Sequence, residues 1–327
     1  MLRKSITLAV TLLVTGLTLV WAQAGGTPVL GDSFDDKMSW LEAFAQSGGN
    51  YIVEVRADEN VAPRSLSYSG KTNITITLRG TGANRTLSLS SNGAMFTVPS
   101  GVTLVLDSNI TLRGRNNNNS SLINVGGRFI MNNGSTITGN SGGGVSNGGT
   151  FTMTGGTISG NANTSATTSG GGVNNGGTFT MSGGTISGNT STNGGGVYVW
   201  NNGIFTMSGG TISGNTGTSG GGVYVNVGSF TMSGGTISGN TSSGSGSGGG
   251  VYVNNAGTFA KTGGTITGYA SDRANGNVVK DASGTIRNYR GHVVYAASSV
   301  PKIREATAGP GDNLSYSPTA VSGAWDN

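Results

Sequence analysis

Residues 176–189 read GGTFTMSGGTISGN, and residues 194–199 continue as GGGVYV. This repeat phrase begins again, with small changes, at Gly148, Gly203, Gly228 and Gly257, and a more diverged copy begins at Gly127. Its phenylalanines lie roughly 22 to 29 residues apart, at Phe129, Phe151, Phe179, Phe205, Phe230 and Phe259. A period in this range is typical of solenoids, whose stacked turns bury a continuous core.

Each copy of the repeat phrase alternates apolar and polar residues over three short runs. The runs are Phe179–Met181, Thr185–Ser187 and Val197–Val199 in the copy quoted above. Strict alternation favours strands with one buried face, whereas a helical period would scatter the apolar residues. Gly-Gly, Ser-Gly-Asn and Gly-Gly-Gly separate the runs and allow tight corners. Three strands and three corners per turn predict an all-β chain folded as a parallel β-helix, with coils about 4.8 Å apart.

Stacking of the coils is expected to place equivalent residues above one another. The predicted inward columns are Phe151, Phe179, Phe205 and Phe230; Met153, Met181, Met207 and Met232; and Ile158, Ile186, Ile212 and Ile237. The last residue of each phrase predicts an asparagine ladder at a turn, formed by Asn161, Asn189, Asn215 and Asn240. Each of these asparagines is able to take the left-handed conformation and to bond its neighbours. These columns are interpreted as core and corner, and the methionines are not a metal site.

The composition supports a solenoid and excludes several classes of protein. Glycine supplies 62 of 327 residues, and only 9% of the residues are charged. Glycine disfavours long helices, and ordinary disorder is richer in charge. The chain has no cysteine, which excludes disulfides, thiolate metal sites and cysteine nucleophiles. Nucleic-acid binding is not predicted, because the net charge is only +5 and the basic residues are dispersed.

The sequence divides into five segments. Residues 1–24 are predicted to be an export signal, with Arg3 and Lys4, an apolar run and a small-x-small cleavage site. Residues 25–50 are expected to form an N-terminal cap with a short helix at Asp32–Gln46, and 51–128 diverged coils. Residues 129–270 hold the regular repeats, and 271–327 the last strands and a C-terminal cap. We therefore expect an exported protein, extracellular, at the cell surface or periplasmic, without an integral membrane segment after signal removal.

The repeat phrase together with GGGVYV resembles the right-handed parallel β-helix repeat proteins of bacterial surfaces, which share the pectin-lyase-like solenoid fold. The resemblance covers residues 51–295 and implies a right-handed coil and an exported, adhesin-like role, without implying a reaction. The repeats are also similar to those of polymorphic outer-membrane proteins, which carry GGAI and FxxN elements. This chain keeps Gly-Gly-Thr-Ile and lacks FxxN.

The distribution of carboxylates argues against an enzyme. Glycoside hydrolysis needs a carboxylate pair, and β-elimination needs a base and commonly a carboxylate-bound calcium ion. No Asp or Glu occurs between Ser108 and Ser271. Asp107 near Arg113 and Arg115 is the one lyase-like combination, and a surface ion pair is the competing interpretation. We therefore predict no catalytic, metal or cofactor residues. The lone histidine, His292, is expected to be a surface or strand residue, and a polysaccharide-binding or polysaccharide-degrading β-helix remains the alternative.

Four aromatic residues are the candidates for binding a partner. Tyr198, Trp200, Tyr224 and Tyr252 are expected to point outward, because the valines beside them point inward. Together they would form a strip on the order of a few hundred Å², a size that often marks an interaction site. Cross-strand stacking that only stabilises the sheet is the competing account.

A second regular surface consists of hydroxyl residues. Two files are predicted, about 4.8 Å apart along the axis and about 6.7 Å across, from Thr157/Ser159, Thr185/Ser187, Thr211/Ser213, Thr236/Ser238 and Thr265/Thr267. These files resemble those of ice-binding solenoids, although a polar face that keeps the sheet soluble explains them as well. The sequence as a whole predicts a secreted or surface-exposed, non-enzymatic β-helix for adhesion or the envelope, with a host or matrix protein or a glycan as partner. Ice binding is the remote alternative.

Overall fold

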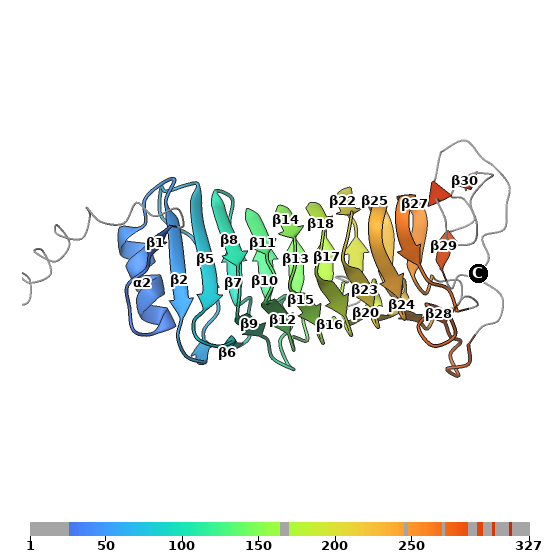
Figure 1. The fold of residues 1–327 in the computed structure, drawn as a ribbon, viewed down its shortest axis with the longest axis horizontal. Coiled ribbons are helices and arrows are strands. Elements are labelled where there is room, and N and C mark those ends of the chain that lie inside the picture. Colours follow the sequence, from blue (N-terminus) through green and yellow to red (C-terminus); the bar gives the residue numbers. More distant parts are fainter. Residues whose placement is uncertain are drawn as a thin grey trace, which may run out of the picture.

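The computed structural model describes residues 26–163, 170–244, 248–269, 272–286, 293–296, 303–304 and 314–315. Over these residues the chain forms an elongated parallel β-solenoid of about nine turns, whose coils stack along its long axis (Figure 1). The helix α2 (Phe34–Phe44) lies at the N-terminal end of the stack. The predicted all-β solenoid with a short capping helix is confirmed. The predicted signal segment and His292 lie outside the described residues.

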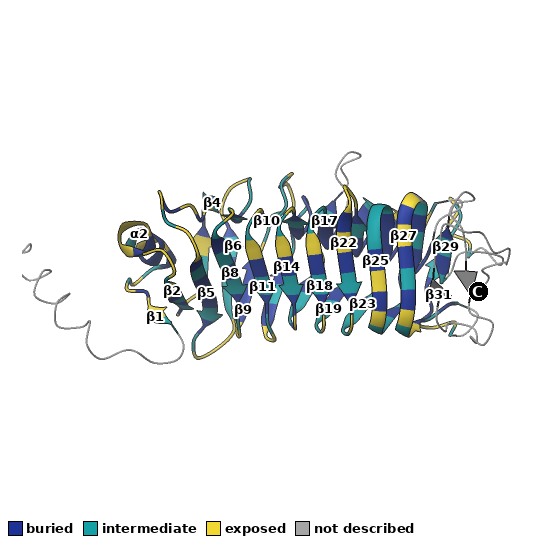
Figure 2. Cartoon of the chain, turned by 90° about the horizontal axis from the view of Figure 1, so that it is seen from above, coloured by how far each residue is buried: buried dark blue, intermediate teal, exposed yellow. Residues whose placement is uncertain are grey.

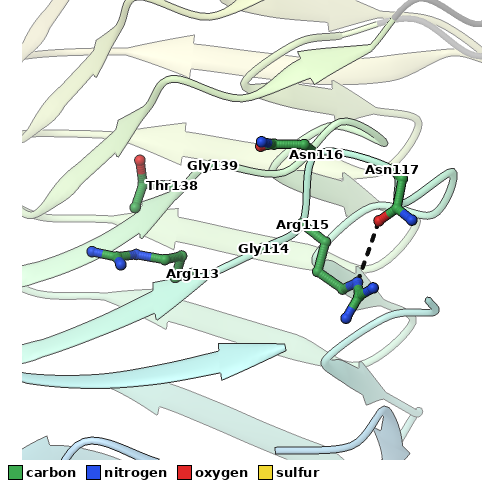
Figure 3. Close-up of a pocket in the computed structure, with 7 residues that line it drawn as sticks. All are labelled: Arg113, Gly114, Arg115, Asn116, Asn117, Thr138 and Gly139. Carbon is green, nitrogen blue, oxygen red and sulfur yellow. Dashed lines mark hydrogen bonds between the residues drawn. The ribbon is translucent and has the colours of Figure 1, made fainter. Parts of the chain in front are cut away.

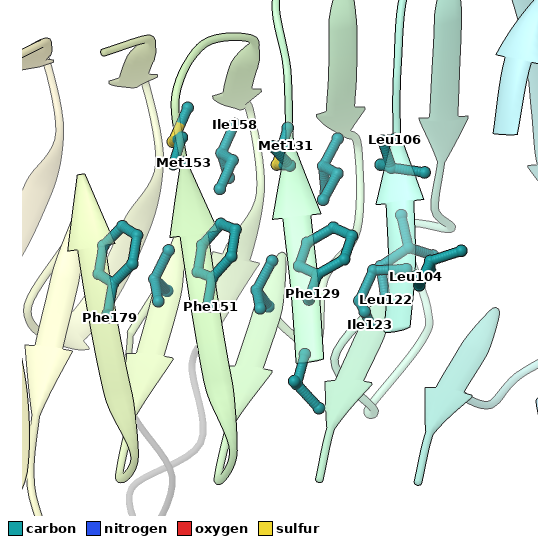
Figure 4. Close-up of a cluster of buried hydrophobic side chains, with 14 of the residues drawn as sticks. Leu104, Leu106, Leu122, Ile123, Phe129, Met131, Phe151, Met153, Ile158 and Phe179 are labelled. Carbon is teal, nitrogen blue, oxygen red and sulfur yellow. The ribbon is translucent and has the colours of Figure 1, made fainter. Parts of the chain in front are cut away.

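The first face of the solenoid carries the phenylalanine column. Its strands are β2 (Asn50–Val55), β5 (Ile74–Gly80), β8 (Val102–Leu106), β11 (Arg128–Met131), β14 (Thr150–Met153), β18 (Thr178–Met181) and β22 (Gly203–Met207), followed by parts of β25 (Val223–Ser238) and β27 (Val251–Ile266). The short β1 (Thr27–Pro28) pairs with β2. Phe151 and Phe179 stack with ring centroids 4.5 Å apart (Figure 4), and the stack continues to Phe259. The predicted inward phenylalanine and methionine columns are confirmed, since their members are fully buried.

The second and third faces complete each turn. The second face consists of β3 (Glu59–Val61), β6 (Arg85–Leu89), β9 (Ile110–Arg113), β12 (Ser135–Thr138), β15 (Thr157–Ser159), β19 (Thr185–Ser187), β23 (Thr211–Ser213) and the ends of β25 and β27. The third face consists of β4 (Arg64–Ser65), β7 (Phe96–Val98), β10 (Ile123–Val125), β13 (Val145–Asn147), β17 (Val173–Asn175), β21 (Val197–Val199), the beginnings of β25 and β27, and β29 (Val294–Ala296). Buried and exposed residues alternate along the strands (Figure 2), and the predicted isoleucine column is buried on the second face.

The structure adds strands that the repeat phrase did not predict. A second, five-stranded sheet follows the asparagine corner and consists of β16 (Ala162–Asn163), β20 (Thr190–Asn193), β24 (Thr216–Ser219), β26 (Thr241–Ser242) and β28 (Val278–Val279). β20, β24 and β26 are rich in hydroxyl residues and lack the apolar alternation on which strands were predicted, whereas Val278–Val279 was expected to be a strand; all five strands stack in parallel register. The short β30 (Ile303–Arg304) and β31 (Leu314–Ser315) pair with each other in antiparallel orientation.

The predicted asparagine ladder is present, but its backbone conformation differs from the prediction. The backbone N–H of Asn161, Asn189, Asn215 and Asn240 each donates to the side-chain oxygen of the asparagine in the next coil at 3.0 Å. None of the four has a positive φ. The left-handed position belongs to the preceding glycine, for example Gly188 at φ +62° and Gly214 at φ +64°. Glycine takes this conformation without a Cβ clash, which leaves the asparagine side chain buried and aligned with its neighbours.

The capping helix begins with a capping box. Ser33 Oγ accepts a hydrogen bond from Asp36 N at 3.1 Å, and Ser33 N donates to Asp36 Oδ2 at 3.0 Å. Phe34 N also donates to Glu59 Oε2 in the first coil at 2.8 Å. Phe34 and the apolar residues one and two turns after it are buried against that coil. The helix therefore covers apolar residues at this end of the core. Within the described residues, no helix is both long and apolar enough to cross a membrane.

Candidate interaction surface

The outer side of the third face carries two neighbouring columns of side chains, which we call the tyrosine face. The first column contains Asn174, Tyr198, Tyr224, Tyr252 and Tyr295, and the second contains Gly176, Trp200, Asn226 and Asn254. Members of the first column are direct partners in successive parallel strands. The register of the coils thus brings together three of the predicted aromatic residues and adds Tyr295. The Val-Tyr-Ala run at 294–296, which repeats the alternation of Val197–Val199, could have indicated Tyr295.

The tyrosine rings form a continuous row along the solenoid axis, in which Tyr252 and Tyr295 are stacked and the other neighbouring rings are tilted against each other. Ring centroids are 5.3 Å apart for Tyr198 and Tyr224, 4.7 Å for Tyr224 and Tyr252, and 5.5 Å for Tyr252 and Tyr295. Tyr198 and Tyr252 are partly exposed, whereas Tyr224 is only 9% exposed. Tyr224 therefore lies on the outer side as expected, but it is much less exposed than a surface strip requires. Rings of the two adjacent coils lie on either side of it, and Gly220 lies close to its Cβ.

The polar atoms of the tyrosine face form an uncharged network. Asn226 Nδ2 donates to Tyr198 Oη at 3.0 Å, and Asn254 Nδ2 donates to Asn226 Oδ1 at 2.6 Å. Burial raises the pKa of Tyr224 above its ordinary value, and the neighbouring phenols of Tyr252 and Tyr198 raise it further. Burial also raises the pKa of Tyr198 and of Tyr252. The phenols of Tyr198, Tyr224 and Tyr252 are therefore neutral hydroxyl groups at any physiological pH.

Trp200 belongs to the second column because it follows Tyr198 by two residues, and a tight turn begins at Trp200. Gly203 N donates to Trp200 O at 2.7 Å, and both central residues, Asn201 and Asn202, have positive φ. This backbone resembles a type I′ turn, for which asparagine is favoured. The indole is 40% exposed. No ring contact joins it to the tyrosines in the described part of the chain, so the predicted single strip is two adjacent columns.

The two hydroxyl files run along the second face, as predicted. Thr185 and Ser187 are direct partners of Thr211 and Ser213, and the same register continues through β25 and β27. Their hydroxyl groups make no hydrogen bonds to other described residues. The files therefore present regular hydroxyl groups to solvent.

The arginines considered for a lyase-like site do not meet a carboxylate. Arg113 and Arg115 line a hollow of about 500 Å³ at the end of β9, and their side chains point apart (Figure 3). Arg115 Nε donates to Asn117 Oδ1 at 3.4 Å. Asp107 precedes the other end of β9 and accepts from Asn132 Nδ2 at 3.3 Å. Among the described residues Asp107 makes no ion pair, so neither the lyase-like combination nor the surface ion pair is formed.

The tyrosine face carries uncharged polar and aromatic groups. No group of three or more His, Cys, Asp or Glu residues is placed to hold a metal ion in the ranges that the structure describes. The tyrosine face combines aromatic rings, phenolic hydroxyls and carboxamides, which bind uncharged polar partners through stacking and hydrogen bonds. Comparison of the chain with protein-family models, with curated proteins and with solved structures gave no match.

Proposed function

We propose that this protein is a secreted or surface-exposed, non-enzymatic β-helix that serves in adhesion or as an envelope component and binds its partner through the tyrosine face. The observation that carries the proposal is the in-register row of Tyr198, Tyr224, Tyr252 and Tyr295 with an exposed Trp200 in the neighbouring column. A rigid row of aromatic and amide groups offers contact area with little loss of side-chain entropy on binding. From the repeat phrase we also infer a right-handed, pectin-lyase-like coil and an export signal at residues 1–24.

A non-catalytic role is supported by the placement of the carboxylates. The segment between Ser108 and Ser271 has no Asp or Glu, so the regular coils lack the acid–base groups that polysaccharide cleavage requires. Asp107 accepts a hydrogen bond from Asn132 Nδ2, and it forms no ion pair with a described residue. Depolymerisation of pectins or host glycans by the pure protein, abolished by Asp107→Ala, would overturn the non-enzymatic assignment.

The binding proposal is tested on an array of glycans and extracellular matrix proteins probed with the exported chain. We expect at least one partner whose signal is lost in Tyr224→Ala and in Trp200→Ala. Thr211→Ala, which removes an outward hydroxyl from the second face, is the matched control and should retain the signal. Partners that bind both aromatic variants as well as the unchanged protein would show that the tyrosine face only stabilises the sheet.

A further inference from the structure

One polar atom at the N-terminal end of the tyrosine face has no partner. The side chain of Asn174 is 6% exposed, and its Oδ1 accepts no hydrogen bond in the described structure. Asn174 alternates with the inward Val173 and Asn175, so it lies on the outer side, directly beside Tyr198 in the next coil. Buried carbonyl groups without a hydrogen-bond donor are rare, because the free-energy cost of removing the carbonyl from water is then not offset by a new hydrogen bond. An acceptor placed here is explained if a ligand supplies the missing donor.

The exposed indole of Trp200 lies next to this acceptor. A Cβ at Gly176 would lie 3.3 Å from both Cε2 and Nε1 of Trp200, so the indole packs directly over this glycine. Gly176 follows Asn174 by two residues and faces the same side of the chain. The indole Nε1–H has no hydrogen-bond partner among the described residues, and the ring is 40% exposed. An aromatic surface and a free N–H donor thus lie over the outward position that follows Asn174 on this side of the chain.

Tyr198 completes the cluster with a hydroxyl group. Because its Oη accepts from Asn226 Nδ2 at 3.0 Å, its own O–H remains available as a donor. The cluster of Asn174, Tyr198 and Trp200 therefore offers the carboxamide of Asn174, a phenol O–H, an indole N–H and an aromatic ring. No Asp, Glu, Lys, Arg or His occurs anywhere between Phe129 and Ala260. A charged partner would find no counter-charge on these coils, whereas sugar hydroxyls both donate and accept.

We propose that the cluster of Asn174, Tyr198 and Trp200 is the binding site for a sugar residue of a neutral glycan, with a sugar hydroxyl donating to Asn174 Oδ1. The sugar ring packs on the indole, and other hydroxyls accept from Trp200 Nε1 and Tyr198 Oη. This sugar site rests on the proposed function of the tyrosine face. It specifies the partner of that face as an uncharged, hydroxyl-rich polymer.

The test is a calorimetric titration of the full exported chain with cellohexaose, mannohexaose and chitohexaose, with polygalacturonate as the charged comparison. We expect at least one neutral oligosaccharide to bind and polygalacturonate not to bind. Asn174→Leu removes the acceptor at similar volume and should weaken binding about tenfold or more. Its urea unfolding midpoint should stay unchanged or rise, because an unpaired buried carbonyl has been removed. A merely structural asparagine would give a lower midpoint instead.

Asn124→Leu is the matched control, because Asn124 occupies the same outward column two coils earlier and lies beside no aromatic residue of the face. It should keep the affinity of the unchanged protein. If Asn174→Leu fails to fold, Trp200→Phe, which retains a ring and loses the N–H, should still weaken binding several-fold. Unchanged affinity in the folded variant tested overturns the sugar site. Binding of a protein but of no neutral oligosaccharide, lost in Tyr224→Ala, also overturns it and leaves the proposed function standing.

Discussion

Asn215 lies at the centre of the buried asparagine ladder, and its replacement by alanine tests whether the ladder holds the coils together. The residue is fully buried and makes four side-chain hydrogen bonds. Its Oδ1 accepts from N and Nδ2 of Asn189, each at 3.0 Å. Its Nδ2 donates to Ile186 O and Asn240 Oδ1, each at 2.9 Å. These bonds connect Asn215 to the coils on both sides.

The expected loss follows from the number of bonds. At roughly 1 kcal/mol of net stability for each buried bond, Asn215→Ala should lower the free energy of unfolding by about 4 kcal/mol. The damage should also be local, because each coil of a solenoid contacts only its neighbours. Hydrogen exchange should therefore become faster in the coils that contain Asn189 and Asn240, while the coils beside α2 keep their protection.

Urea unfolding followed by circular dichroism measures the loss, and hydrogen-exchange mass spectrometry locates it. Asn116→Ala is the control, since Asn116 is exposed, and it should change the free energy of unfolding by less than about 0.5 kcal/mol. A loss below about 1 kcal/mol for Asn215→Ala would refute the ladder as a stabilising element. Uniformly faster exchange along the chain would refute the expectation of local damage.

Three further predictions concern the phenols, the corner glycines and the hydroxyl files. Burial raises the pKa of the Tyr224 phenol, so the stability that this phenol contributes is complete below the pKa of about 10 in the unfolded chain and is lost as the pH rises above that value. Tyr224→Phe should therefore lessen the fall of the urea midpoint at alkaline pH. An unchanged fall would contradict this. Gly214 has φ +64° and no close contact around it, so Gly214→Ala should lower the free energy of unfolding in urea by roughly 1–2 kcal/mol. Gly196→Ala should lower it more, because the new Cβ would lie 2.6 Å from Gly222 O. The reverse order would contradict the corner geometry. Ice recrystallisation should proceed at the buffer rate with pure protein, and inhibition that Thr211→Val abolishes would make the hydroxyl files an ice-binding surface.

The fold could be predicted because the repeat carries the same information many times. Alternation around Phe179 and Ile186 fixes which side chains point inward, and the recurrence of these residues fixes the register between coils. The asparagine ladder followed from the same recurrence. The left-handed corner was assigned to Asn189 instead of Gly188, because both residue types tolerate positive φ and periodicity does not separate neighbours. The two positions are distinguished only by the hydrogen bonds that the asparagine side chain must make to the next coil.

The candidate site was predicted only in part, because it depends on residues that differ between copies. The outward tyrosines were identified by alternation, but the covering of Tyr224 depends on rings in two other coils and on Gly220. Trp200 lies in the second column because it follows Tyr198 by two residues, and the turn that Asn201 and Asn202 form after it has no equivalent in the described copies of the repeat phrase. The unpartnered oxygen of Asn174 becomes visible only once every donor around it has been placed.

The contrast between inner and outer positions explains where a binding function can reside on such a chain. Most inward positions of the first and second faces hold the same residue in successive regular coils, because stacked rings and carboxamides must fit their neighbours above and below. Outward positions of the second face are also uniform, with threonine or serine in every regular coil. The outward first column of the third face changes from Asn174 to Tyr198 and then stays tyrosine, and the second column changes from Gly176 to Trp200 and then to Asn226. Only at this step do an unpartnered acceptor and an exposed indole adjoin, so a partner that recognises one place along an otherwise uniform rod is expected to bind there.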